Sequence, residues 1–244
     1  DVHVGRLRIT DVTLDIAKNP LAAFGADIAF APDGTLQRAG FANDKAKLEL
    51  VPQGPGIRAH FDASAWKLPF GPGVEVDFLT VKGMLGSAQT GTGEFTVKLA
   101  SGSMQGTMKA NWSSTFRLEG EYKVEYMQLA ELARALVPEF TAKGTLKATG
   151  QYITQGENAA AALANLQTDA KFTVTRGELT NIDLVRGIQA PGSAAFRGGR
   201  TGFEELSGTL SLADSSYSYR QVQLASGPLN ASAALDITRG SELS

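Results

Sequence analysis

Strict alternation of apolar and polar residues is the feature that most constrains the fold of this chain. It is clearest in residues 115–126, where charged residues separate the apolar ones. These apolar residues are Phe116, Leu118, Tyr122, Val124 and Tyr126. A period of two residues is that of a β-strand, and it places every apolar residue of the strand on one face. Residues 141–152 repeat the pattern with Ala142, Leu146, Ala148 and Tyr152. Both segments are therefore predicted to be amphipathic strands.

Similar alternation predicts strands along the rest of the chain. They are expected at residues 4–16, 26–30, 35–42, 46–51, 57–65, 74–81, 93–100, 104–112, 170–176, 206–212, 217–224 and 229–237. The phase of the alternation shifts between Ile9 and Val12, and again between Tyr219 and Val222. Each shift predicts a β-bulge or a break in its strand.

Helices are expected to be few and short. Residues 127–137 carry an apolar stripe with helical spacing that ends before Pro138, and residues 157–166 are rich in alanine. A short turn is expected after Asp183, which can cap it.

So few helices cannot cover the apolar faces of about a dozen strands. The sequence therefore predicts a mostly β protein with two or three short helices. It is either one long curved antiparallel sheet with an apolar concave face or a two-sheet sandwich. No low-complexity linker interrupts the chain. Residues 1–244 are thus expected to form a single continuous β-rich unit, with a possible seam near residues 127–141.

Composition disfavours several classes of function. The chain has 23 basic and 25 acidic residues and a net charge of -2, so it lacks the basic surplus that binds nucleic acid. It has no cysteine and only two histidines, which excludes thiolate chemistry and disfavours a transition-metal site. No apolar run approaches the roughly 18 residues that span a bilayer, so any membrane anchor is expected outside this sequence.

Candidate catalytic groups also have simpler explanations. The carboxylate pairs Glu75 with Asp77 and Glu119 with Glu121 are two residues apart, so each pair lies on the polar, solvated face of its strand. His60 falls on a polar face as well. We therefore expect no enzyme, no catalytic residues, no metal and no cofactor.

The second half of the chain contains an ordered series of elements that is similar to a known family. A strand leads into a leucine-rich helix, a Gly-x-Leu strand and an alanine-rich helix follow, and a strand and a paired-strand segment complete the series. These elements lie at residues 124–132, 144–150, 159–166, 172–184 and 201–237. Residues 122–237 thus resemble the C-terminal region of the AsmA-like family, which is related to TamB and to chorein-type bridge lipid-transfer proteins. Arg176 departs from the Asp or Asn that the family often has before the glycine, and Gly177 is expected to supply a positive φ for a turn there.

The resemblance implies a function in the bacterial cell envelope. It implies the periplasmic domain of an inner-membrane-anchored protein that binds or transports lipid between membranes and acts in outer-membrane biogenesis. The expected partner is a phospholipid or another acyl-chain lipid, with envelope proteins as further possible partners and no nucleic acid. The alternative is a closed β scaffold or a protein-interaction module without lipid cargo.

Residues on the inferred apolar faces are the candidates for contact with lipid. They are Phe116, Leu118, Tyr122, Val124, Tyr126, Leu146, Tyr152, Phe172, Val174, Leu210 and Leu212. Packing within the protein core uses the same residue types, so the sequence leaves both interpretations open.

Overall fold

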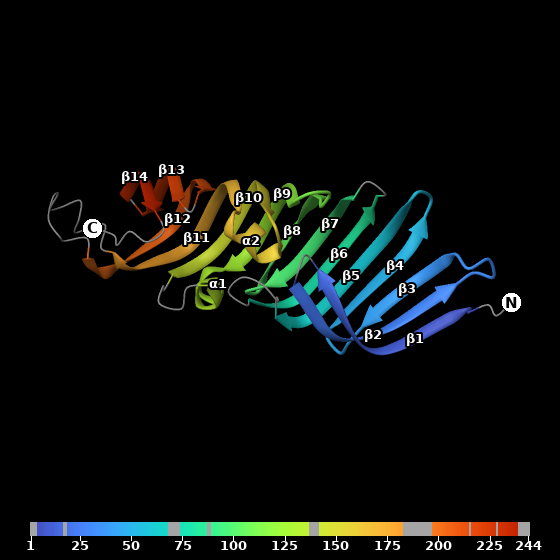
Figure 1. Cartoon of the computed structure of the whole chain (residues 1–244). Coiled ribbons are helices and arrows are strands. Elements are labelled where there is room, and N and C mark those ends of the chain that lie inside the picture. Colours follow the sequence, from blue (N-terminus) through green and yellow to red (C-terminus); the bar gives the residue numbers. More distant parts are fainter. Residues whose placement is uncertain are drawn as a thin grey trace. The chain divides into compact units, whose positions relative to one another are not determined.

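The fold is a single long antiparallel β-sheet (Figure 1). The computed structural model describes residues 4–16, 19–67, 74–86, 89–136, 142–182, 197–214, 216–227 and 229–238. The 14 strands are hydrogen-bonded to one another in the order in which they occur in the sequence. The predicted mostly β architecture is confirmed. The alternative of a two-sheet sandwich is not observed, because all strands of the described residues belong to one sheet.

The strands are long, and two short helices lie in the connections between consecutive strands. The strands are β1 (Arg6–Ile16), β2 (Asn19–Phe30), β3 (Leu36–Ala42), β4 (Ala46–Gln53), β5 (Gly56–Lys67), β6 (Glu75–Leu85), β7 (Thr90–Leu99), β8 (Gly102–Asn111), β9 (Phe116–Gln128), β10 (Ala142–Gly156), β11 (Gln167–Ile182), β12 (Arg197–Ala213), β13 (Ser216–Ser226) and β14 (Leu229–Thr238). The helices are α1 (Leu129–Leu136) and α2 (Ala159–Ala164). Each helix lies inside a segment for which the sequence predicts one. The turn expected after Asp183 lies outside the described residues.

The chain divides into two compact units. Unit 1 comprises residues 1–98, 104–122 and 152–166, and unit 2 comprises residues 99–103, 123–151 and 167–244. Four of the five borders fall inside β7, β8, β9 and β10, and the fifth falls between α2 and β11. Unit 1 contains α2 and unit 2 contains α1.

Each unit has a small hydrophobic cluster on one face of its sheet. In unit 1, Phe24, Ala46 and Ala63 are buried. The half-buried residues around them are Phe41, Phe61, Trp66 and Leu79. In unit 2, Val174, Phe203 and Leu224 are buried. The half-buried residues around them are Leu129, Leu146, Phe172 and Leu206. Because Leu129 is the first residue of α1, this helix begins against the apolar face of its own unit.

Bulges occur where the alternation of the sequence changes phase. The pairing of β1 with β2 shifts register between Ile9 and Val12, and that of β13 with β14 shifts between Tyr219 and Val222. Both predicted irregularities are therefore confirmed. A residue with positive φ lies inside each shift, Asp11 at 58° and Gln221 at 51°.

The turn expected at Gly177 is not present. β11 continues through this position from Gln167 to Ile182. The residue with positive φ is Arg176, at 53°, and not the glycine that follows it. Gly177 instead pairs with Phe203 on β12. The position is a kink within a strand, which a backbone in the left-handed region produces without ending the pairing.

Candidate apolar ligand-binding face

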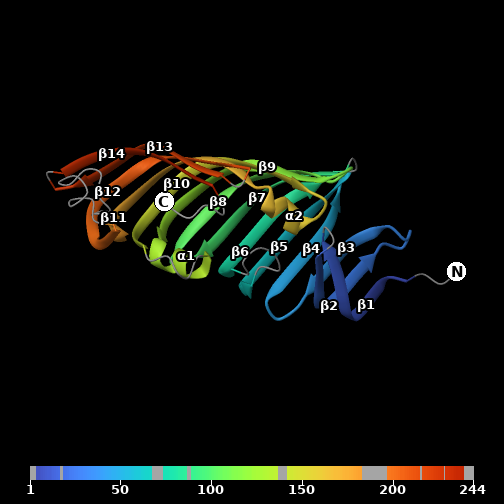
Figure 2. The same cartoon turned by 60° about the vertical axis from the view of Figure 1, so that its left-hand side comes forward.

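Apolar side chains form continuous cross-strand rows on one face of unit 1. The pairing register aligns Ile9, Ala26, Phe41, Leu48, Phe61, Val81 and Phe95 across β1 to β7. A parallel row consists of Leu7, Ile28, Ala39, Leu50, Ala59, Gly83 and Gly93. Successive residues of a strand point to opposite faces, so both rows lie on the same face of the sheet. Figure 2 shows the same strands from a second direction, side by side in chain order.

The corresponding face of unit 2 is also apolar. The register aligns Val174, Leu206, Leu224 and Ala231 across β11 to β14. A second row places Ala170, Leu210, Tyr219 and Leu235 in line across the same strands. Phe172 lies between the two rows on β11. It makes an edge-to-face contact with Tyr219 of the second row, with ring centroids 6.3 Å apart.

Phe24, Phe203 and Leu224 are buried, but most other large side chains of these faces are only half-buried. Among the described residues, alanine and valine make up more than half of the buried hydrophobic positions, including Ala26, Ala39 and Ala63. Phe41, Leu48 and Phe61 remain partly accessible to solvent. In a two-layer fold a second sheet or a set of helices would bury such residues. Each unit therefore presents apolar surface that its described elements cover only in part.

The predicted lipid-contact residues divide between the two units and between different environments. Phe116, Leu118, Tyr122 and Tyr152 belong to unit 1, and all four are half-buried. The remaining candidates belong to unit 2, where Leu146, Phe172, Leu210 and Leu212 are half-buried and Val124 and Val174 are fully buried. The two valines contribute to the packing of the sheet itself, so the half-buried residues are the better candidates for contact with a ligand.

The prediction that Tyr126 continues the apolar face of β9 is wrong. Its side chain is 57% exposed, whereas Val124 and Met127 are buried. Tyr126 has a φ of 59°, and this positive φ shifts the alternation by one residue between Val124 and Met127. The Nζ atom of Lys147 lies 4.4 Å from the centroid of the Tyr126 ring, a cation–π contact among exposed residues.

Several aromatic rings on the apolar faces lie over glycines of the neighbouring strand. A Cβ atom on Gly106 would lie 2.7 Å from Cζ of Phe95, and one on Gly120 would lie 3.1 Å from Cε1 of Tyr152. These rings cover backbone that a glycine leaves bare, an arrangement that compensates for glycine in a strand. Tyr152 also contacts Phe95 and Tyr122, with centroid distances of 6.5 and 6.3 Å.

The same arrangement recurs in unit 2. Phe172 pairs with Gly208 across β11 and β12, and Phe203 pairs with Gly177 across the same two strands. A Cβ atom on Gly208 would lie 3.2 Å from Cζ of Phe172, and one on Gly177 would overlap the ring of Phe203. Phe172 is a predicted lipid contact. Because its ring lies against the backbone of Gly208, only the other face of the ring is available to a ligand.

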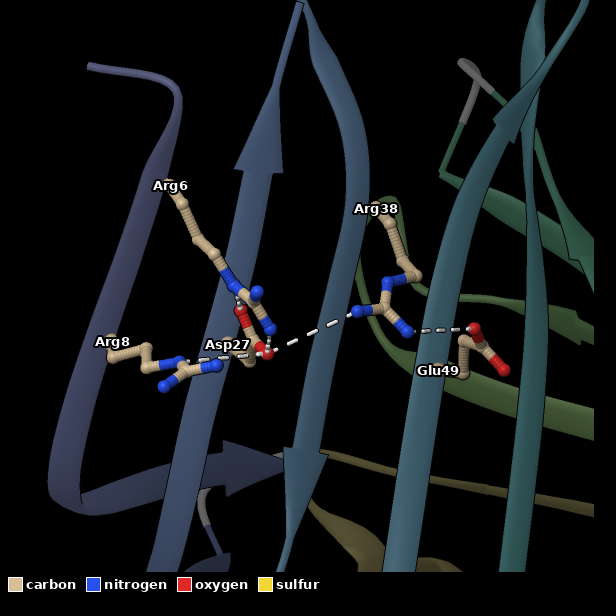
Figure 3. Close-up of polar contacts among 5 residues, drawn as sticks. All are labelled: Arg6, Arg8, Asp27, Arg38 and Glu49. Atoms are coloured by element: carbon tan, nitrogen blue, oxygen red, sulfur yellow. Dashed lines mark hydrogen bonds and ion pairs between the residues drawn. The ribbon is translucent and has the colours of Figure 1, made fainter.

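The opposite face of unit 1 carries a network of charges that sequence patterning did not identify (Figure 3). Asp27 on β2 accepts a 2.7 Å hydrogen bond from Nε of Arg6 on β1. Arg8 and Arg38 lie within 4.0 and 3.9 Å of the same carboxylate, and Arg38 reaches Glu49 at 3.6 Å. The network joins β1 to β4 through residues that are far apart in sequence. Only the pairing register brings them together.

The charges of this network determine the ionisation of its carboxylate. The hydrogen bond from Arg6 holds the pKa of Asp27 below its usual value, and the nearby positive charges of Arg8 and Arg38 act in the same direction. The side chains are exposed, so salt screens the attraction and each pair contributes little to stability.

Neither a metal-ligating cluster nor a membrane-spanning helix is present among the described residues. No group of three or more His, Asp or Glu side chains among them could hold a metal ion. No helix in the described part of the chain is long and apolar enough to cross a bilayer. His60 lies on the polar face as predicted, in register with Glu49 and Lys82.

Comparisons with known proteins give no assignment. No protein-family model, no curated protein and no solved structure matches this chain.

Proposed function

We propose that the apolar face of the sheet binds the acyl chains of a phospholipid or a similar lipid. The observation that carries this proposal is the set of continuous apolar rows whose large side chains are incompletely covered. In the row from Ile9 to Phe95 of unit 1, Ile9 is exposed and the side chains from Phe41 to Phe95 are half-buried. An acyl chain makes no hydrogen bonds, so it fits a surface without donors or acceptors. Each methylene that such a surface removes from water contributes about 0.8 kcal/mol.

The cellular setting that we propose follows from the resemblance of residues 122–237 to the AsmA-like family. In this setting the chain is a periplasmic domain of a protein anchored in the inner membrane. It acts in lipid transport between the membranes and in outer-membrane biogenesis, and it is not an enzyme. The polar, charged face supports an orientation in which that side of the sheet meets water, while the apolar side meets lipid.

Site-specific photo-crosslinking tests the proposal on neighbouring residues of opposite faces. A photoreactive residue at Leu48 in unit 1 or at Leu212 in unit 2 should crosslink to phospholipid when the protein is incubated with phospholipid vesicles. The matched controls are the adjacent residues Lys47 and Ser211, which lie on the opposite face by register. The expected result is lipid adducts in the mass spectrum at Leu48 and Leu212, and none at Lys47 and Ser211.

The same experiment distinguishes lipid binding from a scaffold without cargo. Absence of adducts at Leu48 and Leu212 in folded protein, or equal labelling on both faces, would contradict the proposal. Crosslinks to envelope proteins at these two positions, without lipid, would favour the alternative of a protein-interaction module.

A further inference from the structure

The two end strands of the sheet, β1 and β14, each have a neighbour on one side only within the described chain. An edge strand presents unpaired N–H and C=O groups that can pair with another strand. In β1 the direction of these groups can be assigned. The N–H of Phe30 donates to the carbonyl of Gly5 at 3.0 Å, so in the regular segment from Gly5 to Ile9 the odd-numbered residues direct their backbone N–H and C=O groups toward β2. Because antiparallel pairing alternates, Arg6 and Arg8 direct their backbone groups to the open side.

Exposed large apolar side chains gather at the start of β1. Val4, which precedes it, is 58% exposed, and Leu7 and Ile9 within it are 41% and 43% exposed. Leu7 and Ile9 are the first residues of the two apolar rows of unit 1. A further strand on the open side would continue both rows and cover these two side chains.

β14 has the sequence pattern that such a strand requires. Its register with β13 places Leu235 and Ile237 in the rows of Tyr219 and Tyr217. The intervening Asp236 lies on the other face, where it accepts a 2.9 Å hydrogen bond from Arg220. An apolar, acidic, apolar sequence is thus complementary to Leu7, Arg8 and Ile9 of β1.

We propose that β14 of one copy pairs antiparallel with β1 of a second copy. Arg8 then lies opposite Asp236, Leu7 opposite Ile237, and Ile9 opposite Leu235. Since consecutive strands of this sheet are antiparallel, the added pair maintains the alternation of directions. The apolar rows of one copy continue into those of the next, and the assembly grows head to tail.

Charge favours this pairing over the two registers of β1 with itself that are centred on its arginine-rich start. An antiparallel β1 pair centred on Arg8 or on Leu7 would place arginines of the two copies opposite one another, and like charges directly opposite are unfavourable. Pairing with β14 replaces this repulsion with the attraction between Arg8 and Asp236.

Charge swaps test the proposal in sedimentation velocity experiments over a series of concentrations. We expect the protein to self-associate, and we expect Arg8→Asp or Asp236→Arg alone to weaken the association about tenfold, because each places like charges opposite one another. The double variant should restore it to within about twofold. Lys47→Asp and Asp169→Arg are the matched controls, since each makes the same reversal of charge on an interior strand. A protein that stays monomeric, or an association that the single swaps leave unchanged, would overturn the proposal.

Cysteine crosslinking gives a second readout that does not depend on the strength of the charge pair. The natural chain has no cysteine, so each introduced thiol is unique. Arg8→Cys protein mixed with Asp236→Cys protein should form a mixed disulfide under mild oxidation, because opposed residues have Cβ atoms about 5 Å apart. Asp169→Cys replaces Asp236→Cys as the control. Equal crosslinking to both partners would contradict the pairing, as would dimers of Arg8→Cys alone.

The contribution of backbone hydrogen bonds to the pairing of β1 with β14 can be tested at Arg8. Arg8→Pro removes the outward N–H and leaves the pairing with β2 intact, a change that edge strands tolerate. Arg8→Thr removes the same charge and retains the N–H. Arg8→Pro should therefore associate less than Arg8→Thr, and equal association of the two variants would contradict pairing through the backbone of β1.

Discussion

At the scale of single residues, the contacts between aromatic rings and glycines determine how closely neighbouring strands approach. Gly177 is buried, and a Cβ atom at this position would overlap the ring of Phe203, which is itself buried. No sequence rule identifies this pair, because the two residues are far apart and meet only through the register of β11 with β12. The sequence suggested a turn at Gly177 since glycine adopts positive φ easily, but the glycine is required there for its lack of a side chain.

Gly177→Ala should therefore destabilise the protein by about 2 kcal/mol, since the buried Phe203 ring or the backbone must shift to make room for the methyl group. Gly202→Ala is the matched control. Gly202 lies on the paired strand opposite Glu178, and nothing lies within 4 Å of a Cβ atom placed there. Urea denaturation of both variants measures the difference. Equal midpoints would mean that the strands separate at this point at little cost.

Tyr152 links the aromatic packing of unit 1 to a measurable ionisation. Burial raises the pKa of Tyr152 to about 12, and its hydroxyl donates a 3.2 Å hydrogen bond to the carbonyl of Thr107. Because the pKa in the folded protein lies above the unfolded value of about 10, the neutral phenol stabilises the fold fully below pH 10. This contribution decreases as pH rises toward 12.

Tyr152→Phe should accordingly reduce the late step in the absorbance titration of tyrosine near 295 nm. It should also lower stability at neutral pH by about 1 kcal/mol through loss of the hydrogen bond. Tyr126→Phe, at an exposed position, should leave stability at neutral pH unchanged. Since burial also raises the pKa of Tyr219, part of the late step should persist in Tyr152→Phe. An unchanged titration in Tyr152→Phe would show that solvent reaches this ring.

At the scale of elements, the alternation of apolar and polar residues predicted some β-bulges correctly and missed others. The shifts at Ile9 and at Tyr219 were predictable because apolar residues on both sides of each shift reveal the change of phase. The shift at Tyr126 was missed because tyrosine is itself apolar enough to continue the pattern. The sequence signal for this shift is Met127, an apolar residue that follows Tyr126 directly and is buried in the structure. The charge network around Asp27 was also missed, since it depends on which strands are neighbours.

Arg176 offers a direct test of the strain in such a bulge. A residue other than glycine at positive φ is strained by about 1 kcal/mol, and glycine is not. Arg176→Gly should therefore leave stability unchanged or raise it slightly. Lys171→Gly, at a regular exposed position of the same strand, should lower stability by about 1 kcal/mol. Thermal unfolding compares the two. Equal destabilisation by both variants would mean that Arg176 makes side-chain contacts that outweigh its backbone strain.

At the scale of the whole molecule, the organisation of the chain into one sheet has a consequence for its solvent-exposed surface. Alternating strands can be covered by a second sheet, by helices or by a ligand. The sequence could not choose among these, because the same residue pattern serves all of them. The observed strands belong to one sheet, and the described helices α1 and α2 contain 8 and 6 residues. Phe41, Leu48 and similar residues of the apolar rows thus stay half-buried in the native state.

The folded protein should therefore bind the apolar dye ANS at 25 °C, a property usually associated with partly unfolded states. Phospholipid should displace the dye, and Leu48→Ser with Leu212→Ser should reduce its fluorescence while the far-UV circular dichroism stays unchanged. Lys47→Ser with Ser211→Ala is the control on the opposite face. If the native protein exposes apolar surface, the dye fluorescence should disappear on heating together with the circular dichroism signal of the folded state. Dye fluorescence that appears only above the unfolding midpoint would mean instead that the apolar rows are covered within the folded chain, and the lipid proposal would lose its physical basis.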